Sequence, residues 1–204
     1  MVHYNQDKGK VDLVDDRRIE GEFSMRKEAL LIIDMSNDFV ADDGSLTAGK
    51  RAQAIVPYIL QVSKQMRDNG NLVVICMDTH QPDDSHFQEW APHNVVGSWG
   101  HRLYGELEAW YESAKDDSDV LFVPKQSYNA FHRTGLADKL RERGVDTVHI
   151  TGVCTDICDF LTAAGAYDEG FQTVVHRRGC ATFTANHDTF IEQMALCFHT
   201  KIVD

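Results

Sequence analysis

Short apolar runs alternate along this chain with longer segments in which apolar side chains recur every three or four residues. The apolar runs, each of which predicts a buried strand, are ALLII (29–33), LVVICM (72–77), VLFV (120–123), TVHITGV (147–153), FQTVVH (171–176) and the terminal KIVD. The segments with helical spacing are 50–69, 135–143, 156–169 and 187–197. Gly144 and Gly170 follow two of these segments, where glycine often ends a helix.

This alternation favours an α/β fold built on a parallel sheet. Parallel strands need long crossover connections, and strands that are apolar throughout are covered on both faces. We therefore expect a three-layer, doubly wound, mainly parallel six-stranded sheet with helices on both faces. In such sheets the chemistry lies at the carboxyl ends of the strands.

The length and composition point to one folded domain. With 204 residues and 43% hydrophobic content, the chain can form a full core without a second domain. Residues 1–27 carry many charges, few apolar side chains and no clear period. We interpret 1–27 as an arm, a partner-contact element or a leftover of the expression vector, and assign the fold to 28–204.

The charge balance restricts the partners. A formal net charge of -12 argues against binding to nucleic acid or to an anionic membrane, which need a basic surface. A small uncharged or cationic substrate fits better, and a homo-oligomer remains open. The chain has no apolar run of the ~20 residues that span a bilayer and no secretory signal, so we expect a cytoplasmic protein whose five cysteines are free thiols.

Several chemically capable side chains follow the predicted strands. Asp34, Asp78 with His80, and Lys125 each come at a strand end, and Cys158 lies just past another. The positive end of a helix dipole would favour a thiolate at Cys158. Each residue also has a plainer interpretation: a turn former, a solvated lysine or a buried helix cysteine.

The segment after the second strand predicts a metal site. Asp78 and His80 are two residues apart, so they point the same way at an extended strand end, and His86 and His93 follow in a long irregular stretch. A mixed set of nitrogen and oxygen ligands suits Zn, Mn or Fe. A solvated polar loop is the alternative, because the chain has 10 histidines.

Aromatic side chains are interleaved with these polar groups. Phe39 follows Asp34, Trp90 precedes His93, and Tyr128 follows Lys125. Each one alone is typical of core or surface packing. Together they could form the walls of a slot for a flat ring, so we expect Phe39, Trp90 and Tyr128 to bind substrate.

Four motifs occur in an order that identifies a family. They are LLIIDMSNDFVADDGSLTAG, VICMDTHQPDDSHFQEWAPHNVVGSWGHRLYGEL, VPKQSYNAF and ITGVCTDICDFLTAAGAYDEG. Over 29–204 the chain resembles the nicotinamidases (pyrazinamidases) of the isochorismatase-like cysteine hydrolase superfamily. The resemblance covers several motifs at once and is therefore far more specific than any single motif.

The resemblance implies a catalytic triad of Asp34, Lys125 and Cys158. It also implies a non-proline cis peptide between Val153 and Cys154, and an oxyanion hole made by the backbone N–H groups of Cys154 and Cys158. The triad would deprotonate the thiol, whose ordinary pKa lies near ~8.5.

For the metal, the resemblance implies ligation by Asp78, His80 and His93. Members of the family differ in the remaining protein ligand, which here would be His86, with Glu89 as the alternative. One divalent ion is implied, with zinc first and manganese or iron as alternatives. In nicotinamidases this ion also binds the pyridine nitrogen of the substrate.

The activity implied is hydrolysis of nicotinamide to nicotinate and ammonia through a Cys158 thioester, as a step of NAD salvage, with pyrazinamide as a second substrate. One alternative is a sister amidohydrolase that acts on a ureido compound or a carbamoyl amine. Another is a non-catalytic binding module with the same fold. Isochorismatase activity itself fits less well, because that reaction does not use the cysteine nucleophile.

Overall fold

The computed structural model describes residues 27–204, and almost all of the predicted arm lies outside these residues. Each predicted strand is present. The strands are β1 (Lys27–Ile33), β2 (Leu72–Asp78), β3 (Val120–Lys125), β4 (Val145–Val153), β5 (Gln172–Ala181) and β6 (Lys201–Val203). They form one sheet in the order β3-β2-β1-β4-β5-β6, in which every neighbouring pair is parallel. The predicted sheet is therefore confirmed.

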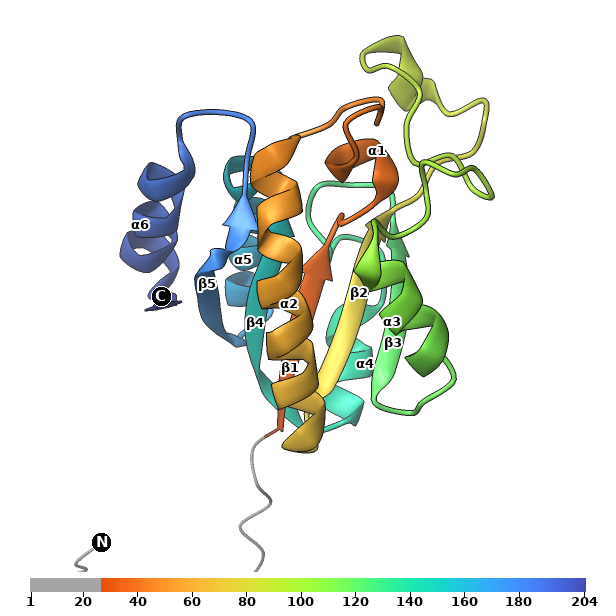
Figure 1. The fold of residues 1–204 in the computed structure, drawn as a ribbon. Helices are drawn as coiled ribbons and strands as arrows, with labels where there is room; N and C mark the ends of the chain where they lie inside the picture. The colour runs from red at the N-terminus through yellow and green to blue at the C-terminus, as the bar shows by residue number, and fades with distance from the viewer. Residues whose placement is uncertain (1–26) are drawn as a thin grey trace, which may run out of the picture.

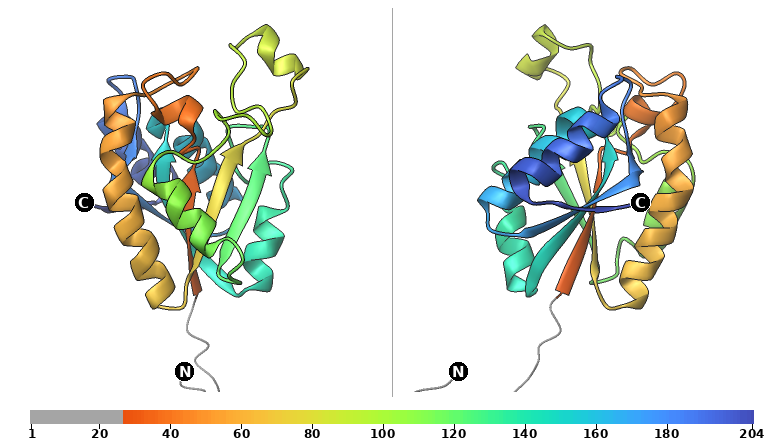
Figure 2. Two further views of the ribbon diagram at one scale, coloured as in Figure 1. Left: turned by 45° about the vertical axis from the view of Figure 1, so that its right-hand side comes forward. Right: turned by 90° about the vertical axis from the view of Figure 1, so that its left-hand side faces the viewer.

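Helices cover both faces of this sheet (Figures 1 and 2). They are α1 (Asn37–Val40), α2 (Lys50–Asp68), α3 (Glu106–Ala114), α4 (Leu136–Glu142), α5 (Phe160–Asp168) and α6 (His187–Phe198). The cores place α2 and α3 on one face and α4, α5 and α6 on the other. The three-layer architecture is confirmed.

The central strand β1 shows why the apolar runs are continuous. Leu31 and Ile33 belong to the core beneath α4, α5 and α6, whereas Leu30 and Ile32 belong to the core beneath α2. All four side chains are fully buried. Since successive side chains of a strand point to opposite faces, a strand between two helical layers has no polar face.

Several helical details differ from the sequence prediction, which did not include the short helices α1 and Ser85–Gln88. The segment predicted as a helix over 156–169 begins with a π-helical turn, η3 (Thr155–Asp159), before α5. Helix α3 was not predicted, because its nine residues bury only Leu107 and Ala114 and so have little apolar period.

All carboxyl ends of the parallel strands meet at one edge, which is the upper edge in Figure 1. The strand order reverses between β1 and β4, and ligands bind at such a switch point in open α/β sheets. None of the helices within residues 27–204 has the length and apolar character needed to cross a bilayer.

Candidate active site

Three predicted site residues meet at this edge. Asp34 follows β1, Lys125 is the last residue of β3, and Cys158 lies in the turn η3. The Lys125 Nζ lies 2.7 Å from Asp34 Oδ2 and 4.0 Å from Cys158 Sγ. All three side chains are buried. The sheet thus brings a carboxylate, an ammonium and a thiol into one cluster.

The backbone fixes the direction of the Asp34 carboxylate. Asp34 has a φ of 55°, in the left-handed region where aspartate occurs more readily than most residues. Its N–H donates to the Cys76 carbonyl (2.9 Å), and its Oδ1 accepts the Asp78 N–H (2.7 Å). Oδ2 is left to face Lys125.

Electrostatics determine which of the three groups holds a proton. Burial raises the pKa of Cys158 well above its ordinary value, and this outweighs the charge of Lys125. For Lys125, burial works to lower the pKa, but the anionic groups of Asp34, Cys158 and Asp78 outweigh it and raise the pKa overall. The raised pKa of Cys158 favours the thiol form beside the Lys125 ammonium, so burial opposes the effect that we expected from the helix dipole.

A proton acceptor lies next to that thiol. The Cys158 thiol and the Asp34 carboxylate are close enough to affect each other's pKa, and burial raises the pKa of Asp34 against the effect of Lys125. A carboxyl group with a raised pKa is better matched to a thiol than an ordinary carboxylate. The arrangement can move the Cys158 proton to Asp34 when a nucleophile is needed.

The backbone before Cys158 forms a tight turn. The peptide between Val153 and Cys154 is cis, as expected from the resemblance. The Cys154 carbonyl accepts the N–H groups of Ile157 (2.9 Å) and Asp159 (3.1 Å). This turn places the Cys158 thiol and the backbone of Cys154 on the same wall of a pocket.

The predicted metal residues form a second cluster beside the first. Asp78 Oδ2 lies 3.0 Å from His80 Nε2 and 3.2 Å from His93 Nε2. The possible ligand atoms of His80, His86 and His93 all lie within 4.8 Å of one another. Glu89, the alternative to His86 as the remaining ligand, is exposed and is not a member of this histidine group.

The outer nitrogens of two rings show that this cluster suits a cation. His80 Nδ1 lies 2.9 Å from Asp84 Oδ2, and His93 Nδ1 lies 2.7 Å from the Ala91 carbonyl. Because both partners are acceptors, each ring can donate a hydrogen from Nδ1, which would leave Nε2, the nitrogen near Asp78, available as a ligand for a cation. Histidine ligands of metals are oriented in this way by outer partners.

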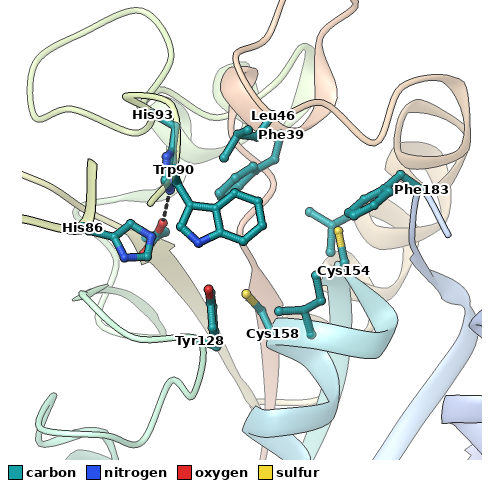
Figure 3. A pocket seen from close by; sticks show the side chains of 12 residues that line it. Phe39, Leu46, His86, Trp90, His93, Tyr128, Cys154, Cys158 and Phe183 are labelled. Atoms are coloured by element: carbon teal, nitrogen blue, oxygen red, sulfur yellow. Dashed lines mark hydrogen bonds and ion pairs between the residues drawn. The ribbon is translucent and has the colours of Figure 1, made fainter. Parts of the chain in front are cut away.

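A pocket opens beside Cys158 and the metal residues His86 and His93 (Figure 3). It contains the three aromatic residues predicted to bind substrate, Phe39, Trp90 and Tyr128. The full lining comprises Phe39, Leu46, Asp78, His86, Trp90, His93, Tyr128, Val153, Cys154, Ile157, Cys158 and Phe183. The aromatic and mostly apolar walls suit a small flat ligand.

Four apolar residues of this lining were not predicted: Leu46, Val153, Ile157 and Phe183. Ile157 follows the predicted strand 147–153 closely, so the strand-end rule could have found it, whereas Phe183 follows β5 only because this strand runs to Ala181, beyond its predicted end at 176. Nothing in the sequence marks Leu46, which reaches the pocket from the loop between α1 and α2.

A buried acid that the sequence did not single out lies directly after Cys158. Both carboxylate oxygens of Asp159 are buried and accept no hydrogen bond of good geometry within residues 27–204, although the Cys180 sulfur is near. Burial raises the pKa of Asp159 well above its ordinary value. The unfolded chain therefore loses this proton at a lower pH than the folded chain, so Asp159 lowers stability as pH rises above its unfolded pKa.

We expect Asp159→Asn to remove this penalty, because the amide is neutral at every pH. The free energy of unfolding of the variant minus that of the native chain should be larger at pH 7 than at pH 4 by more than about 1 kcal/mol. Chemical denaturation at a series of pH values measures this. The exposed Asp168, changed to Asn, is the control. If the free energy of unfolding of Asp159→Asn changed with pH in parallel with that of the native chain, the inference that Asp159 is buried and neutral would be contradicted.

Comparisons with known proteins agree with this geometry. The profile of the isochorismatase domain family matches residues 28–202. An uncharacterized isochorismatase family protein, PncA of Bacillus subtilis, is 42% identical over 160 residues, which are 77% of this chain and 87% of the relative.

Solved structures show the same likeness. The nicotinamidase/pyrazinamidase PncA from Bacillus subtilis superposes with a TM-score of 0.85 at 37% identity, over 87% of this chain and 100% of that one. The pyrazinamidase of Pyrococcus horikoshii in complex with zinc gives a TM-score of 0.77 at 27% identity, over 87% and 99% of the two chains.

Proposed function

The chain belongs to the isochorismatase domain family, and we propose that within this family it is a nicotinamidase, which hydrolyses nicotinamide to nicotinate and ammonia. One observation carries the proposal. The thiol of Cys158, paired with Lys125 and Asp34, opens into an apolar slot whose far side holds the histidine cluster. The slot has aromatic walls that suit a flat heteroaromatic ring, and the thiol stands where its carboxamide would lie.

In the first half of the reaction, Asp34 takes the proton of the Cys158 thiol, and the sulfur attacks the carboxamide carbon. The N–H groups of Cys154 and Cys158 stabilise the oxyanion, and a donor of this kind contributes about 3 kcal/mol in other hydrolases. Asp34 then gives its proton to the leaving nitrogen. The C–N bond breaks, ammonia departs and a thioester remains on Cys158.

In the second half, water attacks the thioester carbon while Asp34 takes a proton from it. The C–S bond breaks, the Cys158 sulfur recovers a proton and nicotinate leaves. Lys125 keeps its charge throughout and balances the negative charge that moves between Asp34 and Cys158. The raised pKa of Lys125 is consistent with this constant charge.

The metal residues complete the slot. We assign Asp78, His80, His86 and His93 as the residues that hold one divalent cation, which when bound supplies a Lewis-acidic contact for the ring nitrogen. Zinc is the proposed ion, since histidine and carboxylate ligands suit it and the Pyrococcus horikoshii pyrazinamidase was solved in complex with zinc. The same ligands would accept manganese or iron.

The chemistry of the slot favours an aromatic amide over the sister substrates. Among the described residues, the lining includes no arginine or lysine side chain. A carbamoyl amine that carries a carboxylate would bury that charge against apolar walls without a partner, which is costly. Neutral nicotinamide or pyrazinamide carries no such charge, and Phe39, Trp90 and Tyr128 offer it aromatic surface.

The wider role follows from the product. Nicotinate is a precursor for NAD salvage. We therefore propose a cytoplasmic enzyme that acts on a small-molecule substrate. The net charge of -12 supports the absence of nucleic acid and membrane partners. Assembly into a homo-oligomer stays a prediction.

A substrate panel tests the proposed function. The full chain, loaded with zinc, is given nicotinamide, pyrazinamide, an N-carbamoyl amino acid and a ureide, and ammonia release is followed. We expect kcat/KM for nicotinamide to exceed that for the N-carbamoyl compound by about 100-fold or more. Turnover of only the carbamoyl or ureido compounds would make it a sister amidohydrolase. Binding of nicotinamide without any turnover would make it a binding module.

A further inference from the structure

The segment that leaves β5 is attached to the turn that carries the nucleophile. Thr182 Oγ1 donates to Asp156 Oδ1 (2.6 Å), and Thr184 Oγ1 donates to Asp156 Oδ2 (2.5 Å). Asp156 belongs to η3, two residues before Cys158. One carboxylate of the nucleophile turn therefore holds both residues that flank Phe183.

A second side chain holds the same segment from the opposite side. Arg51 of α2 donates from Nη1 to the carbonyls of Thr184 (2.5 Å) and Thr182 (3.4 Å). The segment also begins at the sheet, where Ala181 pairs with Val153. The backbone of 182–184 is thus fixed between η3 and α2, and we call this arrangement the threonine clamp.

Phe183 is the residue between the two clamped threonines. Its side chain is 57% exposed, yet it lines the pocket beside Cys154. Figure 3 shows Phe183 on the side of the pocket opposite His86 and His93. An exposed apolar side chain on a fixed backbone is poor core packing, but a bound ring would cover it.

We propose that Phe183 is a specificity-determining residue and that Asp156 is the positioning residue that holds it through the threonine clamp. This inference rests on the proposed nicotinamidase function. Phe183 closes the slot on the side away from the histidines, so it limits the substrate to single heteroaromatic carboxamides without ring substituents on that side. Asp156 acts only through Phe183 in this selection and touches no substrate.

The structural alternative is that Asp156 simply stabilises η3. In that case its loss would disturb the nearby Cys158 and lower kcat for every substrate alike. Under the proposal, its loss releases Phe183, which raises KM for nicotinamide more than it lowers kcat and relaxes selection between ring-substituted substrates. The split between KM and kcat therefore distinguishes a positioning role from a purely structural one.

The experiment uses the zinc-loaded full chain with nicotinamide and with nicotinamides methylated at ring carbon 4, 5 or 6. The variants are Phe183→Ala, Asp156→Ala and the double variant. Thr184→Val removes one clamp hydroxyl, whereas Thr184→Ser keeps it. Leu196→Ala, which truncates a 73% exposed side chain on α6, is the matched surface control. Circular dichroism checks that each variant is folded.

We expect Phe183→Ala to raise the kcat/KM of at least one methylated substrate relative to nicotinamide by about tenfold or more, in line with the discrimination that one methyl group supports in a pocket. Asp156→Ala and Thr184→Val should shift the ratio in the same direction. Thr184→Ser, which keeps the hydroxyl, and Leu196→Ala should both keep the ratio of the native chain. The double variant should have the ratio of Phe183→Ala alone, because two residues in one pathway are not additive.

Two results would overturn the inference. One is an unchanged substrate ratio in Phe183→Ala while nicotinamide is still hydrolysed. The other is a full additional shift when Asp156→Ala is added to Phe183→Ala. If the native chain does not hydrolyse nicotinamide at all, the proposed function itself fails, and this result is separate because it appears before any variant is compared. Should Asp156→Ala fail to fold, the two Thr184 variants test the clamp instead.

Discussion

Replacing Cys158 with alanine lowers kcat for nicotinamide by about 10⁴-fold or more, the range seen when a nucleophile is removed from other hydrolases. Without the sulfur no thioester can form, and neither Asp34 nor Lys125 can take its place at the carboxamide carbon. Among the described cysteines, the Cys158 sulfur is the one for which a contact with Lys125 is found (4.0 Å), although Cys154 lines the same pocket.

The matched control is Cys197→Ala, which removes an exposed cysteine of α6 and should leave kcat unchanged. Both variants are compared with the native chain by ammonia release at saturating nicotinamide. Metal content is measured in parallel, so that a loss of metal is not mistaken for a loss of the nucleophile. Turnover of Cys158→Ala within tenfold of the native rate would rule out covalent catalysis by Cys158.

Removing the divalent cation has the second largest expected effect. Chelation should lower kcat/KM for nicotinamide by about 100-fold or more, and added zinc should restore it, because a cation bound by these residues would contact the ring and supply several kcal/mol of charge stabilisation. The geometry behind this expectation is the convergence of the Nε2 atoms of His80 and His93 on Asp78.

The same prediction can be checked on the ligands themselves. Equilibrium dialysis should find one zinc per native chain and much less in His93→Ala. His132→Ala is the control, because His132 is exposed and lies outside the histidine cluster. Full activity of chelated protein that is shown to be free of metal would contradict the proposed role of this cluster.

Most of the architecture could be predicted from the hydrophobic pattern. A strand such as β1 is apolar at every position from 29 to 33 because both of its faces are covered, and this pattern alone indicates a parallel sheet between helices. The pattern failed for α3, where only Leu107 and Ala114 are buried, and for η3, whose π turn has the same composition as a helix. Local geometry of that kind is determined by tertiary contacts.

The site could be predicted in part for a related reason. Asp34, Asp78 and Lys125 each end a strand, and parallel strands place their ends at one edge, so their meeting follows from topology. The raised pKa of Cys158 did not follow from the sequence, since the extent of its burial is a property of the assembled core. Phe183 and Leu46 reach the pocket along loops, whose paths depend on contacts such as the threonine clamp.

The most direct test of the central claim is product analysis of the zinc-loaded full chain given nicotinamide alone. Nicotinate is quantified by chromatography and ammonia by an enzymatic assay in the same samples over time. The account predicts that nicotinate and ammonia appear in equal amounts, with nicotinamide consumed to match. No nicotinate above the level of a protein-free control, from protein that is folded and carries zinc, would contradict it.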